Sequence, residues 1–171
     1  MPLVPLDSLP NDARAWVFAA DPALDAARSA QLLATVDAYL PTWKAHGSPL
    51  TVGRSLTDGR FLTVAVDQHT AGASGCSIDG LFRVLQDAEE GIGTSMLGGG
   101  RIFFRGAGGL VISCTRQQFE AMAARGEVDA ETVVFDTTVS TAADFRARFE
   151  RRARESWHSQ LFPASGGQAR R

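Results

Sequence analysis

The stretch that decides the fold is "PLTVGRSLTDGRFLTVAVD", residues 49–67, which predicts a β-hairpin. Asp58 and Gly59 fill the centre of a two-residue turn, where both positions need positive φ angles. The second arm, 61–66, carries apolar residues on both faces, which indicates a central strand covered on both sides. Because a hairpin pairs its strands antiparallel, the sequence predicts an α+β fold and not a doubly wound parallel sheet.

Further strands and helices are predicted on either side of this hairpin. Apolar runs predict strands at 15–20, 101–105, 110–114 and 132–136. Capping side chains and apolar residues at helical spacing predict helices that begin at Asp21-Pro22, Ser77, Thr115 and Thr141. We therefore expect a single, mostly antiparallel sheet of five or six strands built from hairpins, with about four helices packed on it.

Length, charge and cysteine content bound the class of protein. The 171 residues are about one domain's worth, so we expect a single globular domain over 1–162 and a disordered tail over 163–171. The net charge of −2 gives no general attraction to nucleic acid or to anionic membranes. The segment "MPLVPLDSLPNDAR" does not resemble a signal peptide. A membrane-spanning helix needs about 18 consecutive apolar residues, and every apolar run in this sequence is much shorter. With two cysteines and no disulfide framework, a cytoplasmic location is expected.

Several common sites are excluded by their motifs. A P-loop needs a lysine after its glycines, and Lys44, the only lysine, lies in "TWKAHG". The dinucleotide fingerprint fails because "GIGTSM" has Met96 at the third glycine position. There is no H-x-x-x-H, C-x-x-C or G-x-S-x-G, so no metal and no cofactor are expected.

The segment "DQHTAGASGCSID", 67–79, is the strongest candidate site. It follows the predicted central strand and leads into a predicted helix. The free N–H groups at a helix N-terminus attract negative charge, and small residues allow a close approach. We therefore expect a small polar or anionic ligand around 74–79. The residues expected to bind it are Trp43, His46, Ser74, Gly75, Ser77 and Asp79.

A cysteine nucleophile is the first alternative. A helix N-terminus lowers the pKa of a thiol, so Cys76 would act as the nucleophile of a hydrolase or transferase. His69 would serve as its base, and Asp67 would orient His69. The structural alternative gives Cys76 a packing role, with Ser74 or Ser77 capping the helix. The sequence leaves these interpretations open.

A basic C-terminal segment gives the second alternative. From Arg146 onward seven arginines stand against Glu150 and Glu155, mostly on one predicted helix and its tail. A solvated helix face explains this pattern, and a structural or protein-interaction module that uses the arginines is the other explanation.

The order of several short motifs resembles a family of small uncharacterised bacterial proteins. The shared segments are "WKAHG", "RFLTVAVD", "ASGCSID" and "SWH", which span nearly the whole chain. Some members are labelled ABC transporter ATPase, although this sequence has no Walker A motif. The resemblance implies no activity, but it singles out positions in the shared motifs. These are Trp43, His46, Asp67, Cys76, Ser77, Asp79, Trp157 and His158.

Overall fold

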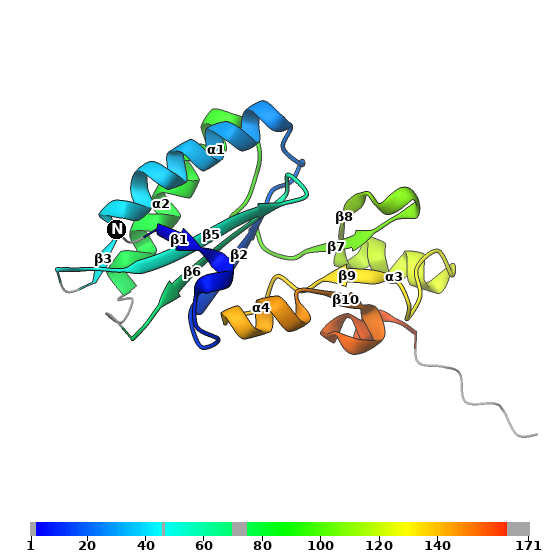
Figure 1. Ribbon diagram of the computed structural model, residues 1–171. Coiled ribbons are helices and arrows are strands. Elements are labelled where there is room, and N and C mark those ends of the chain that lie inside the picture. Colours follow the sequence, from blue (N-terminus) through cyan, green and yellow to red (C-terminus); the bar gives the residue numbers. More distant parts are fainter. Residues whose placement is uncertain (1–2, 46, 70–74, 164–171) are drawn as a thin grey trace, which may run out of the picture. The chain divides into compact units, whose positions relative to one another are not determined.

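The chain forms two compact units, each with its own apolar core. The computed structural model describes residues 3–45, 47–69 and 75–163, with only the backbone for 45 and 75–77. Unit 1 comprises 1–98 and 137–147, and unit 2 comprises 99–136 and 148–171 (Figure 1). Each unit has a four-stranded sheet, so the α+β class is confirmed and the predicted single sheet is wrong. The single domain predicted over 1–162 stays a prediction.

Unit 1 is built on a sheet with the strand order β1-β5-β6-β2. The strands are β1 (Leu3–Pro5), β5 (Thr51–Thr57), β6 (Phe61–Asp67) and β2 (Arg14–Ala19). Only β1 and β5 pair in parallel, and the other pairs of this sheet are antiparallel. A small separate ribbon joins β3 (Lys44–Ala45) to β4 (Ser48–Pro49).

The predicted hairpin of β5 and β6 forms, although its turn has three residues and not the two predicted. Asp58 and Gly59 have φ angles of 56° and 58°, and the Arg60 N–H donates to the Thr57 carbonyl at 3.0 Å. The register pairs Thr57 with Phe61, so Arg60 is a third residue of the turn. Positions 61–66 are all buried, which confirms that β6 is a covered central strand.

Two helices cover one face of this sheet (Figure 1). They are α1 (Ala26–Tyr39), followed by a 3₁₀ turn at Leu40–Thr42, and α2 (Gly75–Ile92). The predicted start of α1 at Asp21 is wrong, because the backbone N–H and carbonyl of Asp21 bond to Ser95 at 2.8 and 3.0 Å. The Asp25 side chain caps the helix instead and accepts from the Arg28 N–H at 2.8 Å.

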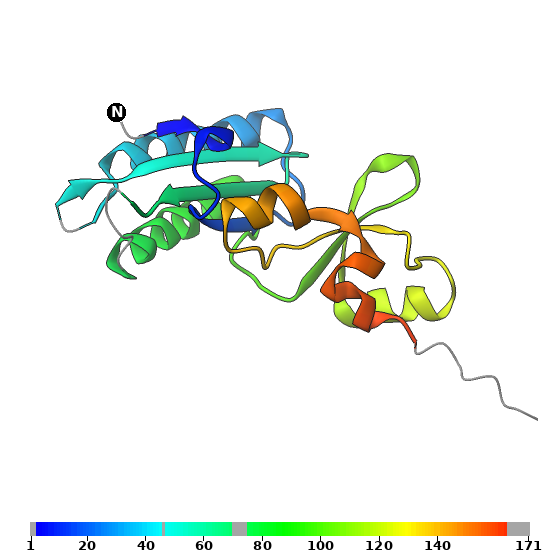
Figure 2. The ribbon, with the colours of Figure 1, turned by 60° about the horizontal axis from the view of Figure 1, so that its bottom comes forward.

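The other face of the sheet is covered by the N-terminal lead-in and by α4 (Ala142–Arg148) (Figure 2). Ala65 of β6 packs there with Ala142 and with Leu6 of the 3₁₀ turn Leu6–Ser8. The Ala142 N–H donates to the Ala13 carbonyl at 2.8 Å, and Arg146 donates to the Leu9 carbonyl at 2.7 Å. A segment from late in the chain therefore completes the core of unit 1.

Unit 2 has the strand order β10-β9-β7-β8, all antiparallel. Its strands are β7 (Arg101–Arg105), β8 (Val111–Thr115), β9 (Val133–Phe135) and β10 (Glu150–Arg152). Its helices are α3 (Arg116–Ala124) and the 3₁₀ turns Ala107–Gly109, Ala153–Glu155 and Trp157–Leu161. The predicted capping box of Thr115 and Gln118 begins α3.

Candidate functional site

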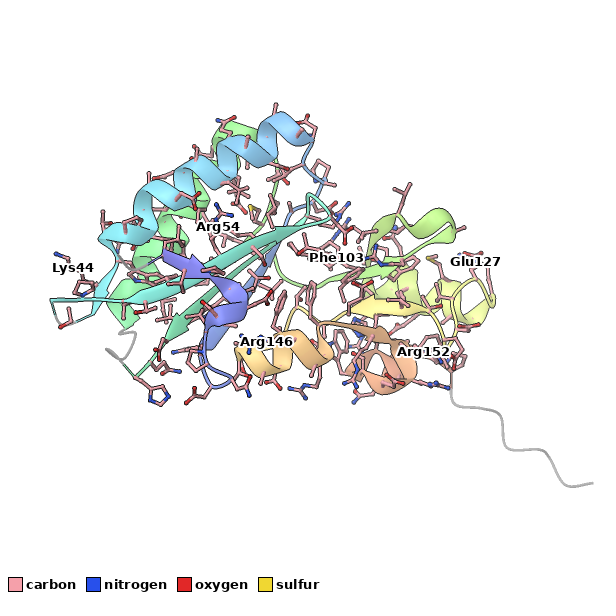
Figure 3. All side chains as sticks on the ribbon, viewed as in Figure 1. Lys44, Arg54, Phe103, Glu127, Arg146 and Arg152 are labelled. Atoms are coloured by element: carbon pink, nitrogen blue, oxygen red, sulfur yellow. The ribbon has the colours of Figure 1, made fainter. Side chains whose placement is uncertain are left out.

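The segment that follows Trp43 and the strand end at Asp67 lie at one end of unit 1. The register of the hairpin places Thr51 opposite Asp67, where β6 ends. The Leu50 N–H donates to the Trp43 carbonyl at 3.1 Å, which closes the β3–β4 ribbon next to that end. Figure 3 shows Lys44 on this ribbon. The strand end at Asp67 and the ribbon therefore belong to one edge of the unit, and Figure 1 shows α2 beginning near the same edge.

His69 is paired at this edge, but with a different carboxylate from the predicted one. Its Nε2 lies 2.8 Å from Asp12 Oδ2, and the two side chains are 67% and 66% exposed. Asp67 accepts from the backbone N–H of His69 at 2.8 Å, so its described bond holds the loop and not the imidazole. The role predicted for Asp67 in orienting the ring stays a prediction, and Asp12 is the carboxylate seen beside the imidazole. No sequence motif marks Asp12. It lies 57 residues from His69 in the sequence, and only the fold brings the two side chains together.

Trp43 is buried in an aromatic cluster beside α2. Its ring is 2% exposed and lies 6.3 Å, between centroids, from the rings of Trp16 and Tyr39. Tyr39 approaches α2 so closely that a Cβ on Gly80 would overlap its hydroxyl oxygen. The Arg14 guanidinium lies 4.9 Å from the centre of the Trp16 ring. The cluster therefore joins the end of α1 to the second turn of α2.

The structure covers the remaining predicted residues unevenly. His46 and Ser74 lie outside the described residues. Gly75, Cys76 and Ser77 form the first turn of α2, and their side chains are likewise outside the description. Asp79 is exposed in that helix. The described part of the edge thus supplies Trp43, Asp67, His69 and Asp79 together with Asp12.

The C-terminal arginines are not on one helix face. Helix α4 ends at Arg148, and the next arginines lie on β10 and on the following 3₁₀ turn. Arg152 and Arg154 both pair with Glu131, at 2.8 and 2.7 Å, and Arg151 lies 3.8 Å from Glu155. Arg146 holds the lead-in through backbone carbonyls (Figure 3). These contacts within the chain weaken the interpretation as an arginine-rich interaction surface.

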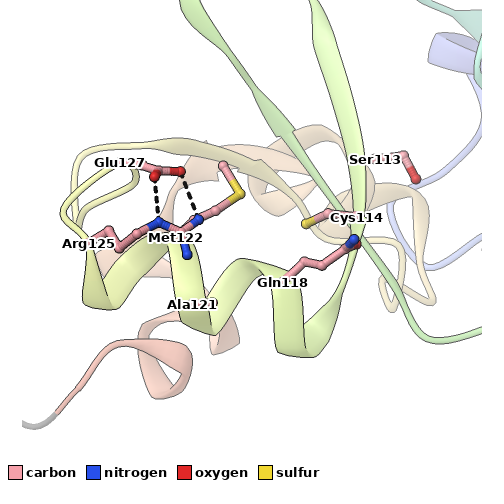
Figure 4. Close-up of a pocket in the computed structure, with 7 residues that line it drawn as sticks. All are labelled: Ser113, Cys114, Gln118, Ala121, Met122, Arg125 and Glu127. Carbon is pink, nitrogen blue, oxygen red and sulfur yellow. Dashed lines mark hydrogen bonds and ion pairs between the residues drawn. The ribbon is translucent and has the colours of Figure 1, made fainter.

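A hollow of about 350 Å³ lies beside α3 in unit 2 (Figure 4). Cys114 and Met122 line it, and Arg125 forms a two-point ion pair with Glu127 at 2.5 and 3.2 Å. Burial raises the pKa of the Cys114 thiol, against the opposing effect of Arg101. A raised pKa disfavours the thiolate, so this cysteine is poorly suited to nucleophilic attack.

The "SWH" motif lies in the core of unit 2. His158 is 1% exposed, its Nδ1 lies 2.8 Å from Ser156 Oγ, and its ring stacks on Trp157 at 3.9 Å. The Trp157 Nε1–H donates to Asp136 Oδ1 at 3.1 Å. Burial lowers the pKa of His158 to about 4, although Asp136 opposes the shift. The described contacts of Trp157 and His158 are therefore hydrogen bonds and ring contacts within unit 2.

Comparison with known proteins adds no family to these observations. No protein-family model, curated protein or solved structure matches this sequence. The resemblance to a family of small bacterial proteins stays a prediction. Among the described residues, no three His, Cys, Asp or Glu side chains gather as metal ligands, and no helix is long and apolar enough to cross a membrane.

Proposed function

We propose that this protein binds a small polar or anionic molecule at the N-terminus of α2, around residues 74–79. The observation that supports the proposal is that the ribbon after Trp43 and the strand end at Asp67 lie at one edge of unit 1, near the start of α2. The sequence predicts Trp43 and His46 to be part of this site, and the register of one hairpin places Thr51, which follows the ribbon, opposite Asp67.

The backbone at the start of α2 suits an anion. A helix of 18 residues carries a partial positive charge and unpaired N–H donors at its first turn. Glycine at position 75 leaves the first amide of the helix open to a close approach.

Removal of one backbone donor tests this proposal directly. Proline is well accepted at the first position of a helix and has no N–H, so Gly75→Pro removes a donor while keeping α2. Gly75→Ala is the matched control, because it adds a Cβ and keeps the N–H. With inorganic phosphate in calorimetry, we expect Gly75→Pro to bind about 10-fold more weakly than Gly75→Ala.

A second measurement locates the binding. Phosphate titrated at constant ionic strength should move the backbone amide signals of 75–79 in a saturable way. Cys76→Ser should bind as the unaltered protein does, because backbone groups make the contacts. Equal affinities of the proline and alanine variants, or no saturable shift at 75–79, would contradict the proposal.

A thiol enzyme that uses Cys76 is the second candidate function. The observation that favours it is the His69–Asp12 pair, since a carboxylate that holds an imidazole is the usual support of a general base. The test is the rate of Cys76 alkylation against pH in a Cys114→Ala background. A thiol pKa well below about 8.5 that rises in Asp12→Asn supports this candidate, and an ordinary pKa in both proteins rejects it.

A further inference from the structure

Exposed apolar side chains gather at one edge of the unit 2 sheet. The strand order of that sheet places β8 at the edge, next to β7. Three large apolar side chains of the described residues are exposed, namely Phe82 at 38%, Leu110 at 76% and Ile112 at 40%. Leu110 directly precedes β8 and Ile112 lies in it. Because alternate residues of a strand share a face, both lie on the same face as Cys114. This edge therefore carries two neighbouring apolar side chains in contact with solvent.

The two edges of this sheet differ in charge. At the other edge, β10 has only three residues, and all of them, Glu150, Arg151 and Arg152, are charged. At β8, the stretch 106–115 contains no charged residue and no proline. Folded proteins protect the edges of their sheets with short strands, charges or proline, because an unprotected edge pairs with another strand. The β10 edge is thus protected against pairing, and the β8 edge is suited to it.

The backbone of β8 is turned so that alternate residues face this edge. The Gly106 N–H donates to the Leu110 carbonyl at 2.9 Å, so Leu110 bonds toward β7. In an antiparallel ladder this direction alternates along the strand, so Val111, Ser113 and Thr115 turn their backbone groups to the edge. The capping box of α3 agrees with this, because the Thr115 N–H is bonded outside the sheet at 2.8 Å. A strand added at this edge would therefore bond to Val111 and Ser113.

We propose that β8 pairs antiparallel with β8 of a second copy of this chain, about a two-fold axis at Ile112. Val111 of each copy then lies opposite Ser113 of the other and exchanges backbone bonds with it. The two Ile112 side chains meet on the axis. Leu110 lies opposite Cys114 of the second copy, beside the hollow next to α3 (Figure 4). Both exposed apolar side chains are then covered. This surface is independent of the ligand proposed for α2.

A second copy of the chain suits this edge because the edge is complementary to itself. An isologous interface uses the same patch twice, so each copy supplies both the exposed Leu110 and the hollow beside Cys114. The stretch 106–115 is uncharged, so its pairing with itself places no like charges opposite each other. A strand of five residues gives less contact than a standard interface, so we expect a weak, reversible dimer at about 10 µM to 1 mM.

Disulfide trapping tests the register of the pairing. In a Cys76→Ser, Cys114→Ser background, Ile112→Cys should form a disulfide-linked dimer under mild oxidation. The reason is that the two residues at 112 face each other with their Cβ atoms about 4.5–5.5 Å apart. Leu110→Cys in the same background is the matched control. Residue 110 lies opposite 114 in this register, so the two cysteines at 110 are about 13 Å apart, beyond the reach of a disulfide. Equal linkage in the two variants, or none at 112, overturns the proposal.

Sedimentation velocity over about 10 µM to 1 mM tests the surface without new cysteines. We expect the unaltered protein to shift reversibly from monomer to dimer. Ile112→Lys should raise the Kd of the dimer about 10-fold or more, because it places two like charges opposite each other at the edge. Phe82→Lys changes a side chain of similar exposure on α2 and should associate as the unaltered protein does. Circular dichroism checks that both variants are folded. A monomer at every concentration, or a dimer that Ile112→Lys leaves unchanged, shows that the proposal is wrong.

Discussion

The buried imidazole of His158 makes the stability of unit 2 depend on pH. Burial lowers its pKa to about 4, whereas a histidine in the unfolded chain titrates near its usual 6.5. Between these values the unfolded state binds more protons than the folded state, so stability falls as pH falls. The contribution is fully present above the unfolded value and is lost as the pH approaches about 4. One pKa unit corresponds to about 1.4 kcal/mol, so the complete loss is about 3 kcal/mol.

The variant His158→Phe isolates this contribution. Phenylalanine keeps a flat ring between Trp157 and Phe119, but it cannot titrate and it loses the bond to Ser156. Urea unfolding followed by circular dichroism, at about pH 7 and about pH 4.5, gives the free energy of unfolding of both proteins. Between these two conditions, we expect the unaltered protein to lose about 2–3 kcal/mol more than the variant.

The comparison between the two proteins removes the background. Carboxylates and the other histidines titrate in both proteins, so their effects cancel in the difference. The reasoning is refuted if the two proteins lose the same stability on acidification, because His158 would then titrate alike in the folded and unfolded states. The result tests the local burial of the imidazole and is independent of the proposed ligand.

Three further outcomes follow from single contacts. Gly80→Ala should destabilise the protein because its Cβ would overlap the Tyr39 hydroxyl, and the same change should cost less in a Tyr39→Phe background, which removes the nearest atom, as thermal unfolding would show. Thr115→Ala removes the cap of α3 and should cost about 1 kcal/mol, with no cost indicating that the capping box is not formed. Arg54 binds Asp37 through two bonds at 2.8 and 2.5 Å, so a double-mutant cycle should give about 1 kcal/mol of coupling at low salt and less at high salt.

Local sequence signals predicted most of the elements. The apolar arm at 61–66 and the Asp-Gly turn before it identified the hairpin, because strand pairing and turn conformation are both encoded within 49–67. The apolar stripe of α2 and the capping box of α3 were equally local and equally informative. The second sheet could not be predicted, because its pairing of β9 with β7 and β10 brings together segments that no short pattern connects.

The candidate site was predictable in part. Asp67, His69 and Trp43 were chosen for residue type and for position next to a strand end or a helix start, and the register of one hairpin brings their segments together. Asp12 was missed because it lies in a loop without a motif and meets His69 only through the fold. The error at Asp21 has a similar cause, since a good local cap was overridden by backbone bonds to Ser95.

The path of the chain has a consequence for its synthesis. The core of unit 1 needs α4, which the ribosome produces only after the first 38 residues of unit 2, 99–136. At about 5–20 residues per second, β6 and its neighbours exist for some seconds before Ala142 can cover Ala65. During that interval a small apolar face of a nearly finished sheet is open to chaperones and to other nascent chains. The core of unit 1 is thus completed by α4, which is synthesised after all four strands of the unit 1 sheet.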